Sequence, residues 1–116
     1  PNIKIEIIPQ RKQEYDTLGD YFQKEDGTWL FRVSEQNDDF EFLTLIHEII
    51  EWYFTKKHGI KEEMITKFDI YHSELGEPGD DKRAPYYKEH KFATKIEKIV
   101  CEELGIMWEE YNKPRI

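Results

Sequence analysis

Histidine and glutamate residues are spaced for metal chemistry in the segment His47-Glu48-Ile49-Ile50-Glu51. On a helix, residues four apart lie on the same face, so the His47 imidazole and the Glu51 carboxylate can converge on one cation. Glu48 leans toward the same edge of that helix. The segment therefore predicts a metal site in which His47 and Glu51 are ligands.

The residues around this segment suggest that the site is buried. Between Phe42 and Thr55 the polar side chains fall within an arc of about 100°, and all other positions are apolar. An ordinary solvated face is wider and mixed in charge, and the alternative here is a narrow solvated stripe. We expect a mostly buried helix whose polar stripe consists of Thr44, His47, Glu48, Glu51 and Thr55.

A second helix, expected from Pro85 to Leu104, carries its own polar anomaly. His90 and Glu97 lie two turns apart in the middle of its predicted core face. A buried carboxylate costs several kcal/mol unless it is paired or binds a metal. The other members of that core face are Tyr86, Phe92, Ala93, Ile96, Ile99, Val100 and Leu104.

The two stripes predict one cluster that contains His47, Glu51, His90 and Glu97, with Glu48 beside it. Two imidazoles and one or two carboxylates suit a divalent first-row metal, and zinc is the ion that we expect. The alternative is a set of His–Glu hydrogen bonds across a helix interface, with no metal.

The elements that must position these residues can be predicted from local patterns. Alternating apolar residues predict strands over 3–8 and 28–34, and the stretch 10–25 is interpreted as loop or irregular strand. Asp38 is the expected N-cap of the first helix, with Glu41 completing a capping box, and His58-Gly59 is its expected end. We expect one further helix over 61–75, a loop over 76–85, Gly105 as the stop of the helix from Pro85 to Leu104, and a packed tail that Pro114 ends.

These elements predict an α+β fold with a single domain over 1–116. A small antiparallel sheet from the N-terminal third packs on about three helices, and the metal-type site lies between the helix that contains His47 and the helix that contains His90.

Composition excludes several classes of function. The 25 acidic residues outnumber the 17 basic ones and give a net charge of −8, which repels nucleic acid. No apolar run approaches the roughly 18 residues of a membrane span. With one cysteine and no signal core at the N-terminus, the chain is expected to be cytoplasmic and free of disulfides.

The segment His47-Glu48-x-x-Glu51, on a helix that follows a strand region, resembles the H-E-x-x-H helix of zincin-like metallopeptidases. The resemblance implies that His47 is a metal ligand and that Glu48 is the general base that deprotonates a metal-bound water. Glu51 replaces the second histidine of the motif, and a downstream residue, His90, is the third ligand. Glu97 is then a fourth ligand or a partner that orients a histidine.

A looser resemblance, to small phage or prophage-type proteins, covers most of the chain. The segments that carry this resemblance are Val33-Ser34-Glu35, the HEIIE helix, Gly59-Ile60, Phe68-Asp69, Pro85-Tyr86 with His90, and Leu104-Gly105-Ile106 with Trp108.

Two functions are therefore expected from the sequence. One is a metal-dependent hydrolase of peptidase type, with a peptide or protein substrate that pairs with an exposed edge strand near 28–34. The other is a non-catalytic phage-type interaction protein, in which the His/Glu cluster binds metal for stability or forms a hydrogen-bonded core.

The remaining chemically active residues are expected to be less important. We interpret His72 as a packing residue, His58 as a cation at a helix C-terminus, and Cys101 as an inert buried thiol. Asp80-Asp81 is interpreted as solvated, and Asp69 as a remote ligand candidate. The sequence does not say whether Tyr15, Asp20 or Arg32 reach the site.

Overall fold

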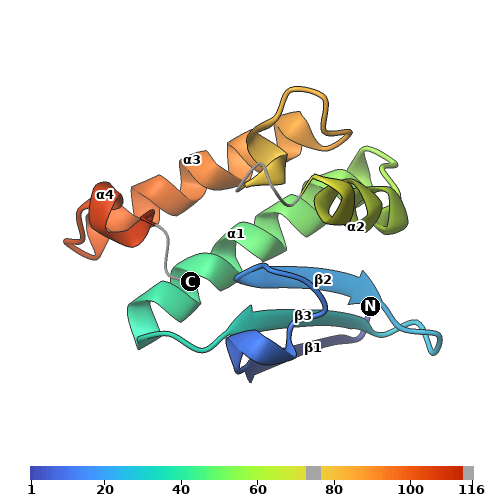
Figure 1. Cartoon of the computed structure of the whole chain (residues 1–116), viewed down its shortest axis with the longest axis horizontal. Helices are drawn as coiled ribbons and strands as arrows, with labels where there is room; N and C mark the ends of the chain where they lie inside the picture. The colour runs from blue at the N-terminus through green and yellow to red at the C-terminus, as the bar shows by residue number, and fades with distance from the viewer. Residues whose placement is uncertain (73–76, 114–116) are drawn as a thin grey trace.

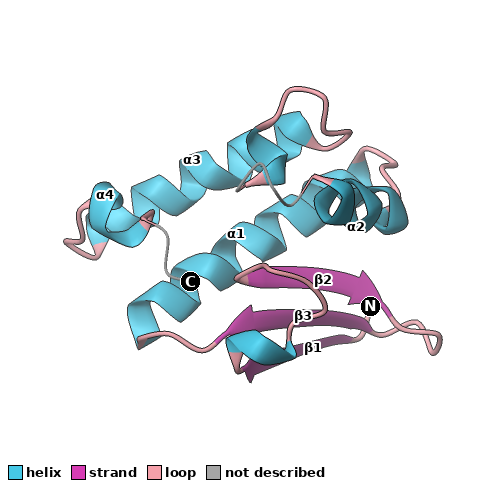
Figure 2. Ribbon diagram, in the orientation of Figure 1, coloured by secondary structure: helices cyan, strands magenta, loops and turns pink. Residues whose placement is uncertain are grey.

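A computed structural model describes residues 1–72 and 77–113 and shows a three-stranded sheet covered on one face by helices (Figure 1). The α+β class is confirmed, with strands and helices segregated as Figure 2 shows. The strands are β1 (Ile3–Ile8), β2 (Gly19–Gln23) and β3 (Trp29–Ser34). The helices are α1 (Asp38–Lys57), α2 (Glu62–Tyr71), α3 (Tyr87–Glu103) and α4 (Trp108–Tyr111), with short 3-10 turns η1 (Gln10–Lys12) and η3 (Pro78–Asp80).

The sheet is mixed, with the strand order β1-β3-β2. The two strands predicted from the sequence, β1 and β3, pair parallel, so the expectation of a purely antiparallel sheet is wrong; only β2 pairs antiparallel with β3. The reason is an additional strand, β2, which forms within the stretch interpreted as loop or irregular strand. β2 pairs on the far side of β3 and runs antiparallel to it, so β3 runs in the same direction as β1. Because β3 is central and paired on both sides, the expectation of an exposed peptide-binding edge near 28–34 is wrong.

The core lies between β3 and α1. Phe31 and Val33 are fully buried, and the Phe31 ring packs edge-on against Trp52 with ring centroids 5.4 Å apart. On β1, however, Ile3, Ile5 and Ile7 are about half exposed although their alternation predicts half-burial. The reason is that α1 packs chiefly over β2 and β3, so it leaves the outer strand uncovered.

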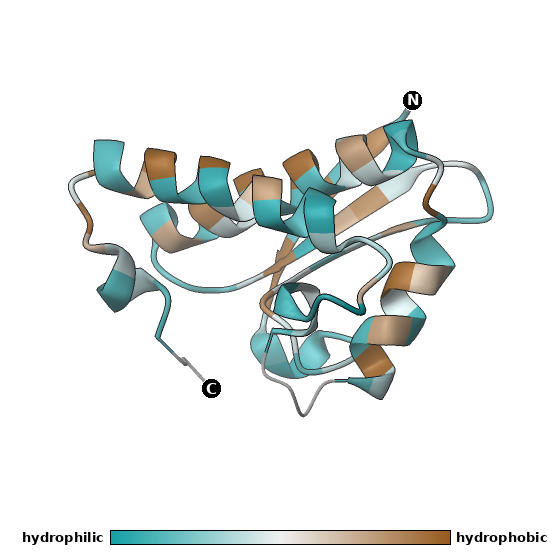
Figure 3. Ribbon diagram, turned by 90° about the horizontal axis from the view of Figure 1, so that it is seen from above, coloured by the Kyte–Doolittle hydropathy of each residue, from teal (hydrophilic) through white to brown (hydrophobic). Residues whose placement is uncertain are grey.

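Helices α1 and α3 pack side by side, and each alternates hydrophobic and polar residues along its length (Figure 3). Their polar stripes face inward: Thr44, His47, Glu51 and Thr55 on α1 are buried, as are His90 and Glu97 on α3. The predicted core face of α3 is wrong at three positions. The buried stripe is centred on His90, Ala93, Glu97 and Cys101, so it turns Phe92, Ile99 and Leu104 outward.

Helix α1 is capped one residue earlier than predicted. The Asn37 side chain accepts the backbone N–H of Phe40 at 2.9 Å, and the Glu41 carboxylate accepts that of Gln36 at 2.9 Å. Asp38 is therefore the first helical residue and not the cap. The predicted stop is confirmed, because His58 is the C-cap and Gly59 follows with φ of 74°.

The other helices differ from their predicted bounds at one end. Helix α2 ends at Tyr71, and His72 is its C-cap. Residues 73–75 of the predicted helix, like Pro114, lie outside the described residues. Helix α3 begins at Tyr87, after a turn that contains Pro85, and Gly105 follows it with φ of 76°. Within residues 1–72 and 77–113, no helix is both long enough and apolar enough to cross a membrane.

The cap assignment can be tested by two neighbouring substitutions. Asn37→Ala should lower the free energy of unfolding by about 1 kcal/mol, because it removes the side-chain acceptor of the Phe40 N–H. Asp38→Ala is the matched control and should cost about half as much or less, through the helix dipole alone. Urea denaturation measures both; equal losses would contradict the assignment of Asn37 as the cap.

Candidate metal centre

Three side-chain atoms from α1 and α3 converge in the buried layer between these helices. His47 Nε2 lies 3.1 Å from Glu51 Oε2 and 3.1 Å from His90 Nδ1, and the His90 atom lies 2.8 Å from the same Glu51 oxygen. All three residues are buried. Thus three of the four ligands predicted from sequence meet at one point, and this group could hold a metal ion.

The size of this triangle suits a small divalent cation. In tetrahedral zinc sites the ligand bonds are about 2.0–2.2 Å long, which places neighbouring ligand atoms about 3.3 Å apart. The observed separations of 2.8, 3.1 and 3.1 Å are a few tenths of an ångström shorter. Small side-chain adjustments would therefore admit an ion.

Each histidine has a carboxylate on its far ring nitrogen. Glu97 Oε1 lies 2.8 Å from His47 Nδ1, and Asp80 Oδ1 lies 3.2 Å from His90 Nε2. An ionised carboxylate there accepts an N–H and fixes the tautomer. The lone pairs of His47 Nε2 and His90 Nδ1 then both point at Glu51 Oε2. Three acceptor atoms so close repel one another unless a proton or a metal cation lies among them.

Of the two roles expected for Glu97, the geometry corresponds to the orienting one. Its carboxylate contacts the outer nitrogen of His47 and also accepts the Tyr111 hydroxyl. Asp80 has the equivalent position for His90, which corrects its interpretation as merely solvated. The sequence signal for Asp80 was weak, because an exposed acidic residue in a Pro/Gly-rich loop is ordinary.

Glu51 is held so that only one of its oxygens faces the histidines. The Tyr21 hydroxyl donates to Glu51 Oε1 at 3.0 Å, and Oε2 faces His47 and His90. Tyr21 comes from β2, which the sequence did not predict, so this contact could not be foreseen. The hydroxyl of Tyr21 makes β2 a part of the site.

Two glycines let backbone approach the site closely. A Cβ built on Gly79 of η3 would lie 2.5 Å from the His90 ring, and one on Gly19 of β2 would lie 2.8 Å from Glu48 Cγ. Any larger residue at Gly79 would collide with the imidazole. The turn that carries Asp80 can therefore pack directly on His90 only because residue 79 is glycine.

Glu48 lies outside the converging group but lines the same cavity of about 640 Å³ as His47, Glu51 and His90. Burial, followed by the nearby charge of Glu51, raises the pKa of Glu48 well above its usual range. A carboxylate so placed holds a proton more readily than an ordinary glutamate does.

Tyr15, Asp69 and Tyr86 form another wall of the cavity, and Asp20, which does not line it, contacts Tyr15. The Tyr15 hydroxyl lies 3.2 Å from both Asp20 and Asp69, and the Tyr86 hydroxyl donates to Asp69. Burial raises the pKa of Asp20 and of Asp69 to about 7. Tyr15 and Asp69 therefore reach the cavity, whereas Arg32 pairs with Glu6 and Glu14 away from it.

The other histidines and the cysteine lie elsewhere. His72 stacks on Phe68 with ring centroids 4.0 Å apart, and the buried Cys101 thiol is not in a disulfide. His58 caps α1 and contacts Glu89 at 2.6 Å. None of the three belongs to the converging group, in agreement with the sequence-based interpretation.

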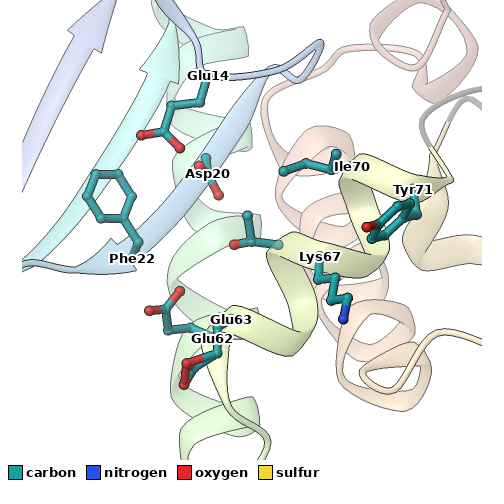
Figure 4. Close-up of a pocket in the computed structure, with 9 residues that line it drawn as sticks. Glu14, Asp20, Phe22, Glu62, Glu63, Lys67, Ile70 and Tyr71 are labelled. Atoms are coloured by element: carbon teal, nitrogen blue, oxygen red, sulfur yellow. The ribbon is translucent and has the colours of Figure 1, made fainter.

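A second pocket, of about 580 Å³, lies between β2 and α2. Figure 4 shows Glu14, Asp20 and Phe22 on one side of it and Ile70 and Tyr71 on the other. It is lined by acidic and apolar residues together with Thr66 and Lys67, and it contains none of the converging ligand atoms. We therefore assign the candidate site to the cavity at His47 and His90.

Comparisons of this chain with protein-family models, with curated proteins and with solved structures found no significant match. The assignment of the site consequently rests on its geometry and chemistry.

Protons can supply the positive charge that this group requires. Burial opposes protonation of His47 and His90, but hydrogen bonds to carboxylates outweigh it, raising the pKa of His47 well above its usual range and that of His90 to about 10. Burial likewise opposes ionisation of Glu51, yet hydrogen bonds from both histidines hold its pKa at about 2. The site thus favours positive charge between its carboxylates.

These shifts predict how the stability of chelator-treated protein depends on pH. Histidines with a raised folded-state pKa stabilise the fold fully below about pH 6.5 and lose that effect as the pH rises toward 10. Between about pH 7 and 9 the free energy of unfolding should fall by about 1.4 kcal/mol per pH unit for each histidine still protonated in the fold. Urea denaturation at a series of pH values measures the slope.

The raised pKa values of Asp20 and Asp69 act in the same direction at lower pH. Their neutral forms favour the fold below about pH 4, and this contribution is lost as the pH rises through 7. His47→Gln should flatten the slope above pH 7. A stability that rises from pH 5 to pH 9 in the wild-type chain would contradict the protonated-pair account.

Proposed function

We propose that this chain is a metal-dependent hydrolase of the zincin-like type. The observation that carries the proposal is the convergence of His47 Nε2, Glu51 Oε2 and His90 Nδ1 within 2.8–3.1 Å of one another, with Glu48 in the same cavity. His47, Glu51 and His90 would hold the ion, and Glu97 and Asp80 would orient the two imidazoles. When bound, a divalent cation supplies Lewis acidity, which polarises a carbonyl and acidifies water.

Zinc is the ion that the donor set favours among divalent metals. Imidazole nitrogens combined with one carboxylate oxygen, and no thiolate, suit zinc in a catalytic site, where three protein ligands leave one position open. The open cavity beside the three atoms gives room for that position. The carboxylate in place of a second motif histidine lowers the net charge of the loaded site.

Glu48 would be the residue that moves protons. It follows His47 on α1 and lines the cavity that a substrate must enter. As a general base it takes a proton from the attacking water, and as a general acid it returns that proton to the leaving group. Burial raises its pKa above the usual range, so it holds an accepted proton more readily than an ordinary glutamate does.

The cavity walls suggest a peptide as substrate. Tyr15, Asp69 and Tyr86 offer hydroxyl and carboxyl groups that can hydrogen-bond to a peptide backbone or to a substrate amine. β2, at the outer side of the sheet nearest to the site, approaches Glu48 through Gly19. An extended chain aligned along β2 would therefore pass close to the proposed base.

Metal binding is tested by titrating metal-free protein with zinc in a calorimeter. One equivalent should bind, and the melting temperature should rise. Loss of a residue that orients a ligand typically weakens metal affinity about 10- to 100-fold. Glu97→Gln should therefore lower zinc affinity by that factor, and His90→Ala, which removes a ligand, should lower it by more than about 100-fold. His72→Ala, which removes a histidine stacked outside the site, is the matched control and should leave affinity unchanged.

The metal proposal fails if wild-type protein takes up no zinc, or if His90→Ala and His72→Ala bind it equally. Binding should also strengthen from pH 6 to pH 8, because the ion must displace protons from His47 and His90.

The hydrolase proposal is tested with zinc-loaded protein on a panel of peptides and esters. Glu48→Gln should lower kcat by about 10²- to 10⁴-fold, because it removes the proton acceptor, while zinc affinity stays within a few-fold. Glu62→Gln changes a carboxylate of the other pocket and should keep full activity. Turnover that survives Glu48→Gln would refute the catalytic role of Glu48. The hydrolase proposal would also fail if zinc-loaded wild-type protein hydrolysed no member of the panel.

A further inference from the structure

Strand β1 presents an exposed apolar row at the outer edge of the sheet. It is the terminal strand in the order β1-β3-β2, and no other strand among the described residues pairs with its outer side (Figure 1). The side chains of Ile3, Ile5 and Ile7 are 47%, 46% and 45% exposed. Proteins usually protect such edges with charges, proline or a covering element, so this row needs an explanation.

The backbone of β1 has a regular set of outward-facing groups. The Asn2 carbonyl accepts the Trp29 N–H at 2.9 Å, and the Ile8 carbonyl accepts the Glu35 N–H at 2.8 Å. Backbone groups of successive residues point to opposite sides of a strand. The even-numbered residues therefore bond to β3, and Ile3, Ile5 and Ile7 direct their N–H and C=O groups outward.

The charges on β1 are arranged symmetrically about Ile5. If two copies of the strand pair antiparallel with a two-fold axis at Ile5, Ile3 lies opposite Ile7 of the other copy. Lys4 then lies opposite Glu6 of the other copy, twice over, so every cross-strand pair from Ile3 to Ile7 is apolar–apolar or opposite in charge. Glu6 also lies 3.6 Å from Arg32 of β3, so the added lysine would extend an alternating row of charges.

This register also suits the backbone. The residues that face each other directly are the same odd-numbered ones whose amide and carbonyl groups point outward, so each facing pair can exchange two hydrogen bonds. A shift by one residue would oppose inward-facing groups and pair Lys4 or Glu6 with isoleucine. One register therefore satisfies hydrogen bonding, charge and hydrophobicity together.

We propose that a second copy of this chain docks on β1, forming a two-fold symmetric dimer with one continuous six-stranded sheet. Ile5 and Ile7 pair in register with Phe31 and Val33, so they lie on the helix-covered face of the sheet. The two isoleucine rows would meet on that face and cover each other. The interface is isologous, as expected for most homodimers, and it is independent of the proposed metal site.

The first test measures the mass of the full chain by light scattering over a concentration series. Wild-type protein should approach twice its 14.1 kDa mass. Ile5→Pro should shift it to a single chain, because proline removes an outward N–H at the centre of the interface while leaving the bonds to β3. Ile99→Ala changes an exposed isoleucine of α3 and should leave the dimer intact.

The second test exchanges charges. Lys4→Glu and Glu6→Lys each place like charges opposite one another, so each variant alone should be monomeric. In an equimolar mixture, a heterodimer sets the two acidic side chains of the Lys4→Glu strand opposite the two basic side chains of the Glu6→Lys strand, so the double mass should return. Circular dichroism establishes that each variant is folded.

A wild-type chain that stays at a single mass across the series would overturn the proposal. So would folded Ile5→Pro protein that remains dimeric, or a mixture of the two charge variants that shows no mass gain over the separate proteins.

Discussion

The arrangement of the molecule depends on one electrostatic constraint: three acceptor atoms are held within about 3 Å of one another in a buried layer ringed by carboxylates. Such a group is stable only with a cation among its members. A proton can take this role, because hydrogen bonds to carboxylates outweigh burial and raise the pKa of both histidines. With small side-chain adjustments the same group could hold a divalent metal ion.

The rest of the fold serves to hold this group in place. Helices α1 and α3 turn their polar stripes toward each other and thereby leave apolar residues such as Phe92 and Ile99 outside. The sheet contributes Tyr21, which fixes Glu51, and η3 contributes Asp80, which fixes His90. Burial of charge is thus compensated by hydrogen bonds from every layer of the structure.

The sequence was informative where two independent patterns agreed. The narrow polar stripe around His47 and Glu51 and the anomaly of His90 and Glu97 each indicated burial, and the structure brings all four together. Helical periodicity is a local property, so it fixes which face a residue occupies without knowledge of the partner.

Long-range features could not be predicted in this way. The strand β2 is short and starts at Gly19-Asp20, so its pattern did not differ from that of a loop; the parallel pairing of β1 and the role of Tyr21 both follow from it. Asp80 acts through a tertiary contact that only Gly79 permits. The exposure of the β1 isoleucines depends on where α1 lies, which no strand pattern contains.

X-ray absorption spectroscopy of the zinc-loaded chain tests the central claim most directly. The account predicts a first shell of nitrogen and oxygen atoms at about 2.0–2.1 Å, outer scattering from two imidazole rings, and no sulfur. Zinc coordinated by sulfur from Cys101, or by fewer than two imidazoles, would contradict the assignment of His47, Glu51 and His90 as the metal centre.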